Sequence, residues 1–340
     1  MIGLVITLDY EVYGTGVGDF RKQMIFPTAE LLNLAHELGV RVTIMAEAAE
    51  ILALRRERSF LATVDAIECQ LVDAIAAGHD VQLHLHPAWF KARYNRSQWE
   101  LAFDEYGLPS LSADTVREYV AVGKQYLDDL GRRVSPDYEC VAFRAGGWLV
   151  QPSATIAAAL TAAGILIDTS VFKGGHGTVG RYRVDFRAAP SAIFPWLADP
   201  ADMSRVSSQG QLLEIPIFCR QVPVWSMLTR RRLGLQRQLG RRSRHSCAPG
   251  SSVAGGQRLR KLALRYPKKF DYCRSTCPEL MSFARQALML TRDTPGPVPV
   301  IAIGHSTEFT DDGVLRRFIE GLRREHGHEV TYQTLAECAR

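Results

Sequence analysis

The chain has 340 residues, of which 46% are hydrophobic and 23% are charged. This composition supports a large globular core and excludes a disordered or collagen-like protein. The length fits either two domains or one (β/α) barrel with an insertion, because such barrels reach about 250 residues as one unit.

No apolar run approaches the ~18 residues that span a bilayer. The seven cysteines are scattered without a CxxC pair. We therefore expect a cytoplasmic protein without a disulfide framework.

The net charge of +5 is concentrated in one segment. Residues 227–270 contain thirteen Lys or Arg and no Asp or Glu, so taking this segment out of the total leaves the rest of the chain at −8. The segment falls within a connection over 219–277 that is far longer than an ordinary βα loop. We interpret 219–277 as a basic insertion within a single domain of residues 1–340. Helices are predicted inside it over Arg230–Gly240 and Gln257–Tyr266.

Short β-branched runs alternate with helix-like segments, as expected for parallel strands joined by crossover helices. Strands are predicted over Ile2–Leu8, Arg41–Met45, Asp80–Leu85, Val141–Arg144, Ile165–Asp168, Leu212–Phe218, Val298–Ile303 and Glu329–Tyr332. Helices are predicted over Thr28–Leu38, Ala46–Arg55, Leu61–Ala77, Ala113–Leu130, Pro152–Ala163, Pro278–Thr291 and Val314–Arg324. Several of these helices end at a glycine, namely Gly39, Gly78, Gly131 and Gly164. The pattern favours an α/β barrel of the TIM type, or an incomplete version of one, over an open doubly wound sheet.

Polar side chains follow most of the predicted strands. Asp9 and Glu11 follow the first strand, Glu47 the second, His84 and His86 the third, Arg144 the fourth, Asp168 the next, and His305 the last long one. In a barrel of parallel strands, the loops at the carboxyl ends gather the catalytic residues. The sequence therefore predicts an active-site rim at this end of the barrel.

Two pairs of these residues have a spacing that suits a metal ion. His84 and His86 stand at positions i and i+2, so an extended backbone projects both rings to one face. Two imidazoles and a carboxylate, with an open position for water, form the usual catalytic zinc site. Asp9 and Glu11 have the same spacing, so one can ligate the ion while the other accepts a proton. A solvated acidic pair beside incidental histidines is the alternative.

Arg144 and His305 suit supporting roles in hydrolysis. Arg144 precedes Gly146 and Gly147, and a guanidinium there could hold a carboxylate base in its ionised form. His305 follows an apolar strand and could protonate a leaving amine or alkoxide. A structural ion pair and a core histidine are the alternatives. The G-x-S-x-G motif that would indicate a serine hydrolase is absent from the sequence.

Four segments in chain order resemble the motifs of the polysaccharide deacetylase family, the NodB-type carbohydrate esterases. Thr7–Glu11 resembles the acidic first motif, Gly78–His86 the histidine motif, Phe143–Trp148 the arginine motif, and Ile303–Ser306 the final histidine motif. The resemblance does not cover the insertion. The resemblance implies a distorted or incomplete (β/α) barrel, and the long basic insertion is an addition of this chain.

The resemblance also implies roles for individual residues. Asp9 would be the general base, Arg144 the group that orients it, His305 the general acid, and Glu11, His84 and His86 the ligands of one divalent ion, with Zn²⁺ expected. The implied reaction is hydrolysis of an N-acetyl or O-acetyl group of a sugar by a water activated on the metal. We further expect Trp148, Glu47 and Asp168 to contact the substrate. Asp168 is also a candidate for the carboxylate that tunes His305.

A cytoplasmic deacetylase would act on a precursor of a surface polysaccharide, such as a sugar nucleotide or a lipid-linked sugar. The basic insertion would then contact phosphates or an anionic membrane face. A nucleic-acid partner is not expected, because few aromatic residues lie among the basic ones. Two alternatives remain open. One is a catalytically degenerate carbohydrate-binding protein on the same fold, and the other is a metal-dependent amidohydrolase acting on a non-sugar amide.

Overall fold

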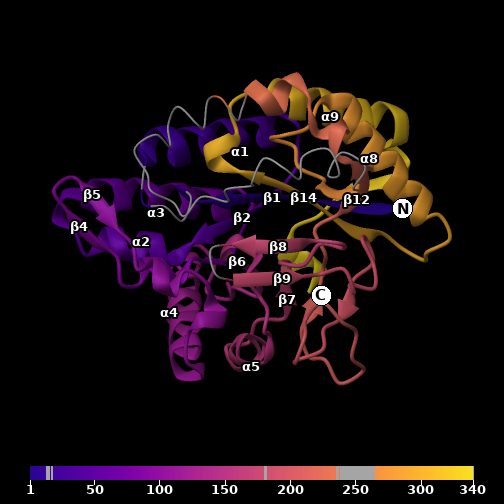
Figure 1. Ribbon diagram of the computed structural model, residues 1–340. Coiled ribbons are helices and arrows are strands. Elements are labelled where there is room, and N and C mark those ends of the chain that lie inside the picture. Colours follow the sequence, from indigo (N-terminus) through magenta and orange to yellow (C-terminus); the bar gives the residue numbers. More distant parts are fainter. Residues whose placement is uncertain (13–15, 17, 180–181, 235–236, 238–264, 340) are drawn as a thin grey trace.

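A computed structural model describes residues 1–12, 16, 18–179, 182–234, 237 and 265–339 (Figure 1). Within these residues, the main sheet has nine strands: β1 (Ile2–Tyr10), β2 (Val42–Glu47), β3 (Asp80–Leu85), β6 (Ala142–Ala145), β7 (Ile167–Asp168), β10 (Trp196–Leu197), β11 (Leu213–Glu214), β14 (Val298–His305) and β15 (Val330–Tyr332). The spatial order is β10-β11-β7-β6-β3-β2-β1-β14, and β15 pairs with the first residues of β1. The pairs from β14 to β11 are all parallel, which agrees with the predicted alternation of strands and helices.

The sheet curls so that its far edge returns to β14. Ile217, which follows β11, forms a parallel bridge with Ile301 of β14, and Asp271 forms a second bridge with Ile303. These contacts are isolated bridges and not a continuous ladder. Pro216 contributes to this break, because it has no N–H to donate to a neighbouring strand. The expected distorted, incomplete (β/α) barrel is confirmed, although the predicted strand over 212–218 is reduced to two paired residues.

Helices surround the sheet: α1 (Phe26–Glu37), α2 (Ala48–Arg55), α3 (Leu61–Ala76), α4 (Ala113–Gly131), α5 (Ala154–Ala162), α8 (Cys277–Leu290), α9 (Gly313–His326) and α10 (Leu335–Cys338). In Figure 1, α1, α8 and α9 lie above the strands, and α4 and α5 lie below them. Gly39, Gly78 and Gly164 follow their helices with positive φ, as predicted. Gly131 instead remains helical, where the ring of Tyr138 leaves no room for a Cβ. Among the described helices, none is both long and apolar enough to cross a membrane.

Three two-stranded antiparallel sheets lie outside the main sheet and were not predicted. They are β4 (Arg93–Asn95) with β5 (Gln98–Glu100), β8 (His176–Val179) with β9 (Tyr182–Asp185), and β12 (Cys219–Pro223) with β13 (Arg265–Lys269). β12 and β13 both lie within the predicted basic insertion of residues 219–277. The helix predicted over 257–266 is wrong at its described end, because Arg265 and Tyr266 pair with Pro223 and Val222. The first predicted helix is seen over residues 230–234, and its remainder lies largely outside the described residues.

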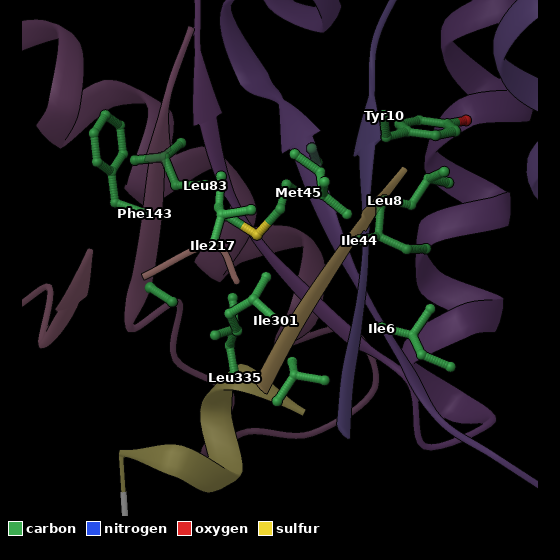
Figure 2. Close-up of a cluster of buried hydrophobic side chains, with 14 of the residues drawn as sticks. Ile6, Leu8, Tyr10, Ile44, Met45, Leu83, Phe143, Ile217, Ile301 and Leu335 are labelled. Carbon is green, nitrogen blue, oxygen red and sulfur yellow. The ribbon is translucent and has the colours of Figure 1, made fainter. Parts of the chain in front are cut away.

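The core is built from side chains that alternate along the strands. Figure 2 shows the buried side chains of Ile6, Leu8, Tyr10, Ile44, Met45, Leu83, Phe143, Ile217, Ile301 and Leu335. Ile6, Leu8 and Tyr10 lie on one side of β1, so Thr7 and Asp9 project from the other side. Both polar side chains are buried. The strand thus packs apolar residues on one face and delivers polar groups on the other.

Candidate active site

The strand register brings the predicted polar residues to one end of the barrel. Asp9 on β1 lies opposite His305 on β14. Glu47 on β2 lies opposite His84 on β3, and His84 in turn lies opposite Arg144 on β6. Because these strands are parallel and adjacent, their ends meet at the same edge. This is the arrangement that the sequence predicted for the active-site rim.

Four buried side chains at this rim could hold a metal ion. Ligand atoms of Glu11, Glu47, His84 and His86 all lie within 4.8 Å of one another. Glu11 Oε2 is 3.6 Å from His84 Nε2 and 3.1 Å from His86 Nδ1, and His86 Nδ1 is 2.8 Å from Glu47 Oε2. Two imidazoles and two carboxylates suit zinc and related divalent ions. Glu47, expected to contact substrate, therefore lies among the potential ligands.

The bonding of His84 and Glu11 fits a cation at this position. His84 Nδ1 lies 2.8 Å from the carbonyl oxygen of Arg144, so Nδ1 donates a hydrogen bond there and Nε2 is the nitrogen that faces Glu11 and would bind a cation. Within the described residues, His84 Nε2 and Glu11 Oε2 are buried without a hydrogen-bond partner. Leaving such atoms unsatisfied is costly, and a cation between them would satisfy both.

Charge coupling within this cluster is strong. Burial disfavours the charged imidazolium, but Glu11, Asp9 and Glu47 together raise the pKa of His84 to about 9. Burial also opposes ionisation of Glu11, yet the neighbouring His86 and His84 lower its pKa. Without a metal, Glu11 and His84 therefore stabilise each other's charged forms, and a bound cation would replace the proton on His84, because an imidazole ligates a metal in its neutral form.

Asp9, Arg144 and His305 form a second group beside the cluster. Arg144 is fully buried and pairs with Asp9, while its remaining nitrogens donate to Thr7 Oγ1 at 3.0 Å and to the carbonyl of Thr169 at 3.1 Å. Although burial opposes it, the charges of Arg144 and His305 lower the pKa of Asp9. His305 Nε2 lies 3.5 Å from Asp9 Oδ2. An ionised carboxylate and an imidazole thus stand side by side.

A carboxylate that the sequence analysis did not identify also faces this group. Asp271 is buried and bridges to β14 two residues before His305. Burial and Glu308 raise the pKa of Asp271, whereas Arg274 and His305 lower it. Asp271 is the first acidic residue after the basic segment, a signal that could have drawn attention to it.

Asp168, the sequence-based candidate for tuning His305, is placed differently. It accepts hydrogen bonds from the hydroxyl and the backbone N–H of Ser170, at 2.7 and 3.2 Å. Its carboxyl is fully buried beside Glu214, and burial raises the pKa of both acids. Its contact with substrate stays a prediction.

The turn after β6 shapes the remaining wall of the site. An added Cβ at Gly146 would lie within 2.7 Å of His86 Cγ and Nε2, so only glycine allows this ring to pack against the backbone. Trp148 has a positive φ of 58° and places its ring edge-on to His305, with 6.3 Å between ring centres. Tyr106, not predicted as a site residue, lies 5.6 Å from His86 between ring centres. Burial, with the charges of Glu11 and Glu47, raises its pKa and keeps its hydroxyl neutral.

No family model matches the sequence, and no curated protein has a similar sequence. Solved structures do resemble the fold. A candidate polysaccharide deacetylase from Mycobacterium smegmatis matches 99% of this chain and 88% of its own, with a TM-score of 0.50 and 14% identity. A GH57-type branching enzyme from Pyrococcus horikoshii matches 98% of this chain and 69% of its own, with a TM-score of 0.51 and 12% identity.

A 4-alpha-glucanotransferase from Thermococcus litoralis matches 99% of this chain and 39% of its own, with a TM-score of 0.51 and 10% identity. At identities this low, the structural matches establish the fold alone. The chemistry has to be inferred from the side chains of the site. The fold is the one that the sequence motifs predicted. This chain has the NodB-type polysaccharide deacetylase fold.

Proposed function

We propose that this protein is a metal-dependent deacetylase that removes an acetyl group from a sugar. The observation that carries the proposal is the buried set of Glu11, Glu47, His84 and His86 directly beside the pair of Asp9 and His305. A cation site next to an ionised base and a proton donor is the arrangement needed to hydrolyse an amide or ester. The similarity to a deacetylase in fold supports the same assignment.

Each group of side chains in the site would have its own role in the reaction. A divalent ion held by Glu11, His84, His86 and Glu47 would lower the pKa of a water and polarise the acyl carbonyl. Asp9, kept ionised by Arg144, accepts a proton from the attacking water. His305 then donates a proton to the sugar nitrogen as the C–N bond breaks, which releases acetate and a free amine. For an O-acetyl group, the sugar oxygen takes that proton.

The arrangement of the carboxylates favours acyl hydrolysis over glycosyl transfer. Glycosidic chemistry needs two carboxyl groups that flank the bond, one as acid and one as nucleophile or base. Here Glu11 and Glu47 face imidazoles, and Asp9 is bound to a buried arginine. We therefore assign the carboxylates nearest the rim to metal binding and proton transfer. The glucanotransferase and the branching enzyme share the fold, but this arrangement of carboxylates does not suit glycosyl transfer.

The proposal is tested by acetate release from a panel of N-acetylated and O-acetylated sugars, with Zn²⁺, Co²⁺ or Ni²⁺ added. We expect Asp9→Asn to lower kcat by 10²- to 10⁴-fold, the usual contribution of a general base. The variant should keep its bound metal, because Asp9 is not among the potential ligands. His36→Ala, which changes an exposed histidine on α1, should retain full activity.

Three results would contradict the proposal. Release of acetate by Asp9→Asn at the wild-type rate would remove the base from the mechanism. Turnover of simple amides but of no acetylated sugar would favour the alternative of an amidohydrolase acting on a non-sugar amide. Binding of sugars without any hydrolysis would instead favour a carbohydrate-binding protein on this fold.

A further inference from the structure

Lys269 lies beside the candidate active site, and the proposed mechanism does not use it. Its ammonium nitrogen is 3.2 Å from the ring centre of Trp148 and 4.2 Å from that of Phe172. The two rings meet nearly at right angles, with 5.8 Å between their centres. Lys269 therefore ends in an aromatic corner, where its charge interacts favourably with both ring faces.

The position of this corner ties it to the reacting groups. Trp148 also packs edge-on against His305, and Asp271, two residues after Lys269, bridges to β14. Lys269 is the last residue of β13, where it pairs with Cys219. The basic insertion thus returns to the barrel through a strand that delivers one lysine next to the proposed acid.

Within the described part of the chain, the Lys269 ammonium has neither a hydrogen-bond acceptor nor a carboxylate at ion-pair distance. Two other lysines nearby do have such partners. Lys268 pairs with Glu279, and Lys173 donates to the carbonyls of Ala189 and Pro190. Burial, aided by Arg274, lowers the pKa of Lys269 to about 7, although Asp271 and Asp9 act in the opposite direction. An ammonium that is partly dehydrated and has three unused donors favours a ligand that brings a negative charge.

We propose that Lys269 binds an anionic group of the substrate, a carboxylate or a phosphate ester carried close to the acetylated position. This inference rests on the proposed function and extends it to the class of sugar. An anion at the ammonium would form charge-assisted hydrogen bonds, which are about twice as strong as neutral ones. A neutral hydroxyl would leave the partly buried charge without compensation. Because Lys269 covers a face of Trp148, that face is closed to stacking of a sugar ring.

Binding tests the proposal without relying on turnover. Glucose, glucose 1-phosphate and glucuronate have no acetyl group, so the metal-loaded protein cannot deacetylate them. We expect calorimetry to show that at least one of the two anionic sugars binds the wild type tenfold or more tightly than glucose. A preference for the phosphate would identify a phosphate ester, and a preference for glucuronate would identify a carboxylate.

The variants separate a binding role from a structural one. Lys269→Met should lose the preference for the anion, and Lys269→Arg should keep most of it. Lys268→Met removes the neighbouring lysine, which faces the other side of the strand and pairs with Glu279, and it should leave the preference unchanged. Circular dichroism checks that each variant is folded.

Acetylated counterparts of these sugars provide the second readout. Lys269→Met should raise KM for the preferred anionic substrate by tenfold or more, with less than a threefold change in kcat or in the rate on N-acetylglucosamine. Equal affinity of the wild type for all three non-acetylated sugars, or an unchanged preference in Lys269→Met, would overturn the role of Lys269. Absence of acetate release from every substrate would instead refute the proposed function, while the calorimetry would still decide the role of Lys269.

Discussion

Arg144 is the residue on which the arrangement of the reacting groups depends most. Its guanidinium is fully buried and binds Asp9, Thr7 and the carbonyl of Thr169, so its orientation is set from three sides. Asp9 is nearly as deeply buried and would tend to be neutral in apolar surroundings. The pairing lets a carboxylate remain ionised where it can act as a base.

This pairing predicts how stability depends on pH. The pKa of Asp9 is lower in the folded state than its ordinary value of 3.8. Its stabilising effect is therefore complete above pH 4 and is lost as the pH falls through the lowered pKa. Asp9→Asn should reduce the free energy of unfolding at pH 7 by about 3 kcal/mol, because it leaves the charge of Arg144 buried without a partner.

The difference between the free energies of unfolding of the two proteins should narrow below pH 4, because Asp9 then binds a proton in the unfolded wild type and, at still lower pH, in the folded wild type, where the proton breaks the pair with Arg144. Urea unfolding of metal-free protein at pH 7, 4 and 3 measures this difference. A difference that stays constant over that range would show that Asp9 is not held ionised by Arg144.

The residues that could be proposed for the site from the sequence are those that stand at the ends of predicted strands and match the motifs of a known family. His84 and His86 at i and i+2, and Asp9 at the end of an apolar strand, are of this kind. Lys269 and Asp271 could not be recognised in this way. Their roles are inferred from the bridge to β14 and from the ring of Trp148, which are contacts between segments distant in the sequence.

Among the secondary-structure elements, the long apolar strands of the main sheet were predicted well. The short polar strands of the two-stranded sheets were not predicted. β1 and β14 are almost continuous apolar runs, because helices cover the outer face of the barrel. β13 has the sequence Arg-Tyr-Pro-Lys-Lys, which lacks the alternation of a half-buried strand. Its conformation comes from pairing with β12, so tertiary context overrides local propensity there.

The turn from β6 to Trp148 contacts the candidate metal-binding cluster at His86 and the group of Asp9, Arg144 and His305 through the ring of Trp148. Gly146→Ala would place a methyl group against the ring of His86 and displace that ring. Since small displacements of a ligand typically weaken metal binding 10- to 100-fold, we expect a loss of about that size in chelator competition. Gly177→Ala, which has open space around its new methyl group, is the matched control. Unchanged metal affinity in Gly146→Ala would indicate that His86 is not a ligand.

At the scale of the whole molecule, the fold and the function are separate conclusions. Similar folds occur in a candidate polysaccharide deacetylase, a 4-alpha-glucanotransferase and a GH57-type branching enzyme, so the fold does not decide the chemistry. The side chains at the strand ends make that decision. Among the residues that the structure describes, Glu11 Oε2 and His84 Nε2 are buried without a hydrogen-bond partner, and they lie 3.6 Å apart in the middle of these side chains.

The metal content of the purified protein is the most direct test of the proposed metal centre. We expect about one equivalent of a divalent ion, with Zn²⁺ as the first candidate, in the wild type and none in His84→Ala after both are loaded and dialysed. At a free metal concentration one hundred times Kd, binding should stabilise the wild type by about 2.7 kcal/mol and raise its Tm, with no shift in the variant. A wild type that binds no metal, or a His84→Ala variant that binds as much, would contradict the central claim that these four residues form a metal centre.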